Sequence, residues 1–194
     1  MPRVVAIHQP NFLPWLGFFD KMDRGDVFVL LDRVQLIRRS YTTRTTVLQG
    51  GQPVVLSLPV RHIGTQDLPI GDALLDDGVR ATRKAAATIR HAYSRYPFWS
   101  DVGTPIVALL EQPPDHLLDL NAELLQHLAR VLGIPWTKVT RQSELPHTGK
   151  KSELMASLTR AVDGDVYLSG GHDPAGHPAT SAAGTGAEYN DERV

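Results

Sequence analysis

A histidine and two carboxamides follow directly on a short apolar stretch near the start of the chain. Residues 4–7 form a β-branched run typical of a buried strand, and the string His8-Gln9-Pro10-Asn11 comes at its end. An imidazole titrates near neutral pH, so His8 is suited to act as a general acid or base. We therefore expect His8 to be catalytic, with Gln9 and Asn11 binding substrate. The alternative is a core histidine followed by two residues that cap a turn.

The elements that must position these groups are the strands of a sheet. Apolar runs predict strands at residues 4–7, 26–32, 54–60, 135–140 and 166–168. Helical spacing predicts helices that begin near residues 15 and 79, helices at 104–111 and 152–162, and one that follows Pro113-Pro114 and stops at Gly133. Alternating strands and helices predict an α/β fold with a mainly parallel sheet flanked by helices. Ligands of such sheets bind beyond the carboxyl ends of the strands, where His8 is expected.

A polar stretch interrupts this alternation at residues 33–52. Its string Gln49-Gly50-Gly51-Gln52 predicts the turn of a hairpin-like insertion. Asp32, just before the stretch, is expected to fix the tautomer of His8, and Arg44 within it to hold a phosphate or carboxylate through two hydrogen bonds. The alternatives are that Asp32 caps a turn and that Arg44 is a surface residue of a strand.

A glycine-rich segment follows the last predicted strand. Ser169 and Gly170 offer backbone donors at a strand end, which favours a substrate-binding or oxyanion site there, although a tight loop explains them equally well. Beyond them the sequence is rich in Gly, Pro, Ala and Thr. We expect one α/β domain over residues 1–171, then a flexible loop and a truncated C-terminal segment over residues 172–194.

One side of the helix that begins near residue 79 is basic. Arg80, Arg83, Lys84 and Arg90 share this side, opposite a row of alanines. Two interpretations stay open. The charges form either a solvated surface or a platform for phosphate or carboxylate.

Composition narrows the class of protein. The 194 residues are 42% hydrophobic and 21% charged, carry a formal net charge of -1 and include no cysteine. This balance is typical of a globular domain and argues against nucleic acid and membrane as partners. The absence of cysteine excludes disulfides, thiolate metal sites and a cysteine nucleophile. No zinc, Walker or dinucleotide motif is present, so we expect no metal and no cofactor, and a cytoplasmic protein of open oligomeric state.

Several segments taken together resemble one family. The string from His8 to Gly17 continues into Phe19-Asp20-Lys21, and further matching segments are residues 26–35, the region of Arg44 and Tyr167-Leu168-Ser169-Gly170. This pattern resembles the WbqC-like family of bacterial proteins, found in gene neighbourhoods for surface polysaccharides and natural products. Residues 172–183 depart from the pattern as an insertion, and the family runs on for several more strands.

The resemblance implies an enzyme that decorates sugars or small molecules. It favours a transferase that moves an acyl, aminoacyl or similar group onto a sugar or small metabolite, with His8 as general base. Trp15 and Gln35 lie in the matching segments and join the expected substrate-binding residues. The expected partners are a nucleotide-sugar or a carrier-bound acyl donor. A protein that binds a nucleotide-sugar or a partner without catalysis, and a nucleotidyltransferase-like enzyme, stay open as alternatives.

Overall fold

The structure, a computed structural model, describes residues 1–61, 68–76, 78–169 and 191–193. The chain divides into two compact units. The sheet unit comprises Met1–His8, Trp15–Leu31 and Thr137–Val194, and the hairpin unit comprises Gln9–Pro14 and Asp32–Trp136. The division into compact units does not test the single domain expected over residues 1–171, which stays a prediction. The loop expected at 172–194 lies outside the described residues, apart from 191–193.

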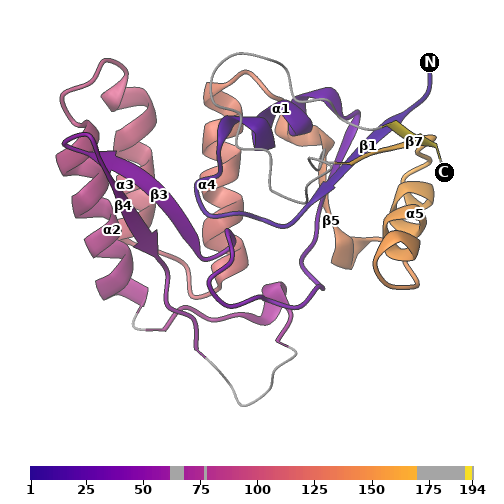
Figure 1. The fold of residues 1–194 in the computed structure, drawn as a ribbon, viewed down its shortest axis with the longest axis horizontal. Coiled ribbons are helices and arrows are strands. Elements are labelled where there is room, and N and C mark those ends of the chain that lie inside the picture. Colours follow the sequence, from indigo (N-terminus) through magenta and orange to yellow (C-terminus); the bar gives the residue numbers. More distant parts are fainter. Residues whose placement is uncertain (62–67, 77, 170–190, 194) are drawn as a thin grey trace. The chain divides into compact units, whose positions relative to one another are not determined.

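A five-stranded sheet organises the sheet unit, in the order β5-β2-β1-β6-β7. Four strands run parallel, and β7 joins antiparallel to β6. Figure 1 shows the sheet between helices α1 and α5. This arrangement confirms the α/β fold with a mainly parallel sheet. The elements are β1 (Val4–His8), α1 (Leu16–Arg24), β2 (Val27–Leu30), β5 (Val139–Arg141), α5 (Ser152–Ala161), β6 (Val166–Leu168) and β7 (Asp191–Arg193).

The two central strands form the core of the sheet unit. All four residues of β2 are buried, and Val5 and Ala6 of β1 have no exposed surface. Phe18 of α1 packs near Phe28, with ring centroids 5.4 Å apart. Strands buried on both faces read as continuous apolar runs, which explains why they were evident in the sequence.

The hairpin unit begins with two antiparallel strands, β3 (Arg44–Gln49) and β4 (Gln52–Ser57). The turn between them is formed by Gly50 and Gly51, whose φ angles are 58° and 78°. A two-residue turn that fits the twist of a hairpin needs left-handed backbone at both positions, where glycine is not strained. The predicted hairpin is thus confirmed.

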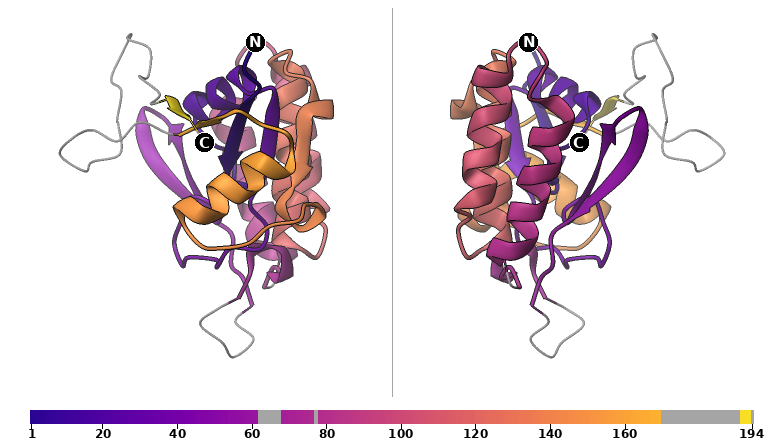
Figure 2. Two further views of the ribbon diagram at one scale, coloured as in Figure 1. Left: turned by 90° about the vertical axis from the view of Figure 1, so that its right-hand side faces the viewer. Right: turned by 90° about the vertical axis from the view of Figure 1, so that its left-hand side faces the viewer.

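Helices complete the hairpin unit, as Figure 2 shows. They are α2 (Gly78–Tyr93), α3 (Thr104–Glu111) and α4 (Leu117–Val131), with a short 3-10 turn, η1 (Ile70–Asp72), and a π-helical turn, η2 (Trp99–Gly103). Leu48 of β3 donates its N–H to the Tyr93 hydroxyl at 2.9 Å, which ties the hairpin to α2. A shared core includes Val47, Leu56, Leu58, Ala85, Ile89, Ile106, Leu110, Leu117, Leu120 and Leu124.

One strand begins later than the sequence predicts. The run 135–140 opens with a 3-10 turn, η3 (Trp136–Lys138), and pairing with β2 starts only at Val139. Lys138 explains the difference, because its ammonium donates to the carbonyls of Asp23 and Gly25 at 2.9 and 3.0 Å. These bonds to the end of α1 favour a turn at Lys138 instead of strand pairing.

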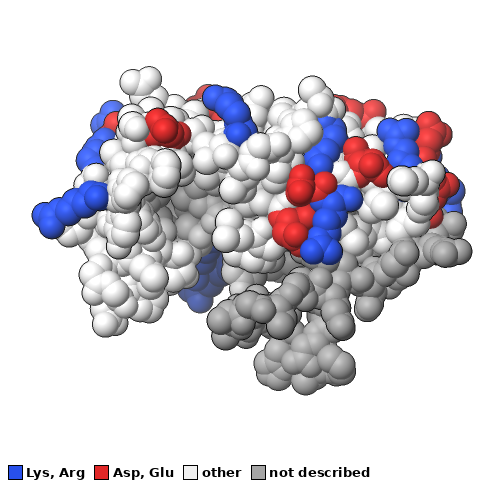
Figure 3. Space-filling model, turned by 90° about the horizontal axis from the view of Figure 1, so that it is seen from above, with Lys and Arg blue, Asp and Glu red and all other residues white. Residues whose placement is uncertain are grey.

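Acidic and basic side chains are intermixed over the described part of the surface seen in Figure 3. Arg90, on the basic side of α2, pairs with Glu111 of α3 at 2.7 Å, so part of that side is a solvated, paired surface. Among the described residues, no helix is long and apolar enough to cross a membrane.

Candidate functional site

The carboxyl ends of the parallel strands bring three polar residues to one edge of the sheet unit. His8, the last residue of β1, pairs with Leu30 of β2, and Leu30 pairs in turn with Arg141, the last residue of β5. On the other side of β1, Ala6 pairs with Leu168 of β6, so Ser169 follows at the same edge. An imidazole, a guanidinium and a hydroxyl therefore come from three different strand ends.

The strand order reverses beside β1. From β1 the chain passes through α1 to β2, and β5 lies beyond β2, whereas α5 leads back to β6 on the opposite side of β1. Open α/β sheets bind their ligands at such a reversal, beyond the carboxyl ends of the two strands that flank it. Here these strands are β1 and β6, which end at His8 and Ser169.

The His8 side chain is partly exposed and lies among aromatic rings. Its ring centroid is 5.0 Å from that of Phe18 and 6.2 Å from that of Trp15, both in edge-on geometry. Trp15 is 53% exposed. Its indole lies against Gly17, where an added Cβ would be 2.7 Å from the indole Nε1. The absence of a side chain at Gly17 thus leaves room for the Trp15 indole beside His8. An exposed indole in this position is what a substrate-binding role for Trp15 requires.

Lys21 of α1 is buried against β1, where its partner is the residue before His8. Only 5% of the residue is exposed, and its ammonium donates to the carbonyl of Ile7 at 2.9 Å. The same nitrogen lies 5.5 Å from the centroid of the Tyr167 ring in β6. Burial lowers the pKa of Lys21 from 10.5 to about 8. Lys21 thereby fixes the residue before His8 and touches both strands at the reversal.

Lys21→Met is expected to change how stability depends on pH. In the folded protein the ammonium loses its proton near pH 8, whereas in the unfolded chain it does so near 10.5, so the unfolded chain binds more protons between these values. The wild-type protein should therefore gain stability relative to the variant as pH rises through this window, by about 3 kcal/mol in all. Urea unfolding of both proteins at several pH values measures the difference. A difference that stays constant from pH 7.5 to 10 would contradict the burial of a charged Lys21.

The segment after β5 adds further polar groups to the sheet unit. Glu144 accepts hydrogen bonds from the Arg141 N–H at 3.1 Å and from the Thr140 hydroxyl at 2.9 Å, and these bonds lower the pKa of Glu144. Gln142 is 2% exposed, and its Nε2 lies 3.2 Å from Nε2 of His147. These contacts stabilise the turn that follows Arg141.

In the hairpin unit, a buried asparagine holds the segment Gln9–Pro14. The amide nitrogen of Asn121, on α4, donates to the carbonyls of Pro10 at 2.8 Å and Thr42 at 2.9 Å. Phe12 donates its N–H to the carbonyl of Tyr41 at 2.9 Å, so the segment runs beside residues 41–42. The Thr42 hydroxyl also lies 3.4 Å from Oε1 of Gln9. Asn121, from a helix distant in sequence, therefore contributes two of the hydrogen bonds that hold this segment beside residues 41–42.

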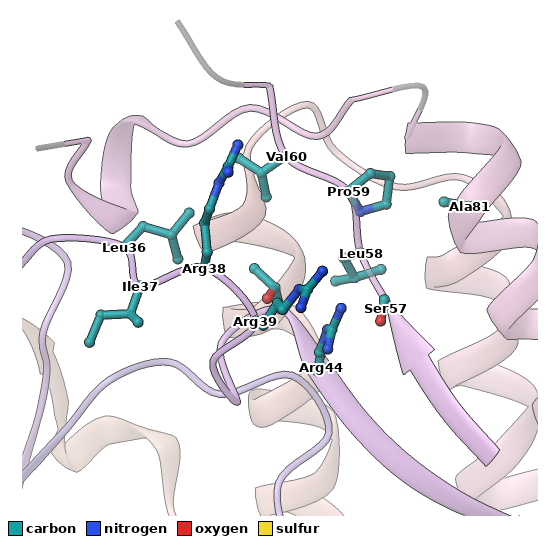
Figure 4. Close-up of a pocket in the computed structure, with 11 residues that line it drawn as sticks. Leu36, Ile37, Arg38, Arg39, Arg44, Ser57, Leu58, Pro59, Val60 and Ala81 are labelled. Carbon is teal, nitrogen blue, oxygen red and sulfur yellow. The ribbon is translucent and has the colours of Figure 1, made fainter. Parts of the chain in front are cut away.

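The remaining expected site residues of the hairpin unit differ in exposure. Asn11 and Asp32 are 2% and 3% exposed, whereas Gln35 is exposed and forms an isolated bridge with Pro69. Arg44 begins β3 and lines a pocket of about 570 Å³ together with Arg38 and Arg39, drawn in Figure 4. Gly170 lies outside the described residues.

The expected residues thus fall into two groups. His8, Trp15 and Ser169 belong to the sheet unit, and Gln9, Asn11, Asp32, Gln35 and Arg44 belong to the hairpin unit. Within the described ranges, no three His, Asp or Glu side chains are grouped as metal ligands.

A sequence profile of the WbqC-like protein family matches residues 9–191. The chain belongs to the WbqC-like family. It is also 28% identical over 170 residues to "Uncharacterized protein Rv1507c" of Mycobacterium tuberculosis (strain ATCC 25618 / H37Rv), across 87% of this chain and 72% of that protein. No solved structure matches the chain. The matched residues include the segment Gln9–Pro14 and all residues that line the arginine pocket, whereas β1 with His8 precedes the match.

Sequence reasoning assigned no role to three groups that the structure makes prominent. Lys21 stood in the matching motif, but nothing in the sequence marks it as buried. Arg38 and Arg39 lie in the polar stretch 33–52, and they share a pocket with Arg44 only once the hairpin has formed. Asn121 is a single polar residue in an apolar helical stripe, and that irregularity was the one available signal.

Proposed function

We propose that this WbqC-like protein is a transferase that moves an acyl or aminoacyl group from a carrier to an amine or hydroxyl of a sugar or small metabolite, with His8 as general base. One observation carries the proposal: His8 ends β1 at the strand reversal, partly exposed, with Ser169 at the end of the neighbouring strand. Trp15 supports it by offering an exposed aromatic face to a substrate next to the imidazole.

In the proposed step, the acceptor amine or hydroxyl attacks the acyl carbon of a carrier-bound donor. The neutral imidazole of His8 accepts the acceptor's proton as the new C–N or C–O bond forms. The bond from the acyl carbon to the carrier then breaks, and the proton passes from His8 to the departing thiolate or alkoxide. The hydroxyl and N–H of Ser169 are suited to stabilise the negative charge on the acyl oxygen. The chain has no cysteine, so no thioester to the enzyme forms, and in the proposed step the acyl group passes directly from donor to acceptor.

Incubation of the purified protein with acyl thioesters tests this proposal. Acetyl- and glycyl-thioesters of coenzyme A are each combined with glucosamine and with an amino sugar linked to uridine diphosphate. We expect one combination to release free thiol and to give an acylated product of the corresponding mass. Donor consumption without an acylated acceptor would indicate hydrolysis and would contradict the transfer.

The arginine pocket favours a second candidate function, a protein that binds an anionic small molecule without transforming it. Three arginines line this pocket in the hairpin unit, and the proposed base is in the sheet unit. A thermal-shift measurement with the same compounds distinguishes the two functions. Stabilisation by a uridine diphosphate sugar with no product in any mixture would favour binding alone.

A further inference from the structure

We infer that the arginine pocket of the hairpin unit is a binding site for a phosphorylated small molecule, in which Arg38, Arg39 and Arg44 hold a phosphate or diphosphate group. The inference concerns the hairpin unit alone and does not depend on any role of His8. The pocket encloses about 570 Å³, a size typical of small-molecule sites. Its lining residues are Leu36, Ile37, Arg38, Arg39, Thr43, Arg44, Ser57, Leu58, Pro59, Val60 and Ala81.

The charge of the pocket is the first argument. Three guanidinium groups line it, and none of the described lining residues is acidic. Like charges gathered in one concave site repel one another and raise the local concentration of anions. Figure 4 shows the side chains of Arg38, Arg39 and Arg44 extending in the same direction. An anion with two or more negative charges would relieve this repulsion.

The second argument is the contrast with other arginines of the same unit. Arg33 lies 3.1 Å from Asp72, and Arg90 lies 2.7 Å from Glu111. Among the described residues, by contrast, no hydrogen bond or ion pair is formed by the guanidinium of Arg39 or Arg44. Their donors therefore stay available in the position that a ligand would occupy.

The backbone at Arg39 gives a third argument. Its φ angle is 61°, in the left-handed region that disfavours residues other than glycine and asparagine. The turn that contains Arg39 would form more readily with glycine at this position. An arginine kept in strained backbone at the rim of a pocket is better explained by its side chain than by its local conformation.

The uncharged part of the pocket defines the rest of the ligand. The guanidinium fork binds two oxygens of a phosphate at once, and the Ser57 hydroxyl can donate a further hydrogen bond. Leu36, Leu58 and Val60 form an apolar wall next to the charged groups. Ala81 of α2 lines the pocket on another side. These features suit a phosphate joined to a partly apolar organic group.

Titration calorimetry on the full chain tests the inference, with inorganic pyrophosphate and uridine diphosphate as probes at constant ionic strength. We expect both probes to bind, and uridine diphosphate to bind more tightly because it also contacts the apolar wall. Arg44→Ala should weaken pyrophosphate binding about tenfold or more, as expected for the loss of a charged, bidentate contact. Arg83→Ala is the matched control, because residue 83 is exposed and lies on the side of α2 away from Ala81, and it should change affinity less than twofold.

Arg39→Gly separates binding from folding. Glycine tolerates the φ angle of this position, so the thermal midpoint should stay the same or rise, whereas the affinity for pyrophosphate should fall. Pyrophosphate affinity unchanged by Arg44→Ala and Arg39→Gly would overturn the inference. It would also be overturned if succinate bound as tightly as pyrophosphate, or if only a single-stranded oligonucleotide bound. Binding of pyrophosphate by a protein that lacks transferase activity would leave the inference intact and contradict the function proposed for His8.

Discussion

His8→Gln is expected to lower the turnover number of the transfer reaction by about a hundredfold or more, while the fold is retained. Removal of a positioned general base has an effect of about 10²–10⁴-fold in enzymes that rely on one. Glutamine keeps a polar side chain of similar reach but cannot accept the proton. Because the position is only partly exposed and its ring packs edge-on to Phe18, some loss of stability is expected as well, and it is measured separately by urea unfolding.

The pH dependence of the rate gives a readout that a structural role would not affect. The wild-type rate should fall as pH decreases and the base becomes protonated, and this acidic limb should be missing from the residual activity of His8→Gln. His91→Gln, on the exposed surface of α2, is the matched control, and it should have the wild-type rate and the wild-type dependence of the rate on pH. A His8→Gln variant that is folded and fully active would show that the His8 imidazole takes no part in the reaction.

The sheet was predictable because its central strands, β1 and β2, are buried. Residues 27–31 form an uninterrupted apolar run between Asp26 and Asp32, and β2 takes up its first four residues, all of them buried. The same reasoning placed His8 at a strand end, and the structure makes it the last residue of β1. The hairpin was equally predictable, since adjacent glycines between two extended segments specify a tight turn.

The strand order was not predictable from the sequence, and therefore the residues that neighbour His8 at the strand ends were not predictable either. Nothing in the sequence states that β6 lies beside β1 or that β5 lies beyond β2, because periodicity is a local property. The position of Ser169 at the reversal, and of Arg141 at the same edge, follows only from this order. The burial of Lys21 was missed for the same reason, since it depends on Tyr167, which is distant in sequence.

Asn121→Asp is expected to lower the free energy of unfolding by about 4 kcal/mol at pH 7, because it leaves a buried charge without compensation. Asn121 has no exposed surface, and its amide is the donor to the carbonyls of Pro10 and Thr42. An ionised carboxylate removes both hydrogen bonds and places negative charge beside two carbonyl oxygens. Gln126→Glu makes the same chemical change on the exposed side of α4, and it should alter stability by less than about 0.5 kcal/mol.

The effect of Asn121→Asp should depend on pH in a defined direction. Burial raises the pKa of the introduced carboxyl above its value in the unfolded chain, so the folded state binds the additional proton. The loss of stability should therefore be smallest near pH 4, where the protonated acid can still donate one hydrogen bond, and should grow as pH rises to 7.

Asn121→Leu should lower the free energy of unfolding less than Asn121→Asp at pH 7. The reason is that Oδ1 of Asn121 has no partner among the described residues, so its removal offsets part of the loss. Hydrogen exchange of the Phe12 N–H, bonded to Tyr41, should accelerate in both variants, because Asn121 holds the segment Gln9–Pro14 against residues 41–42. Unchanged protection of that N–H would show that the segment is held without Asn121.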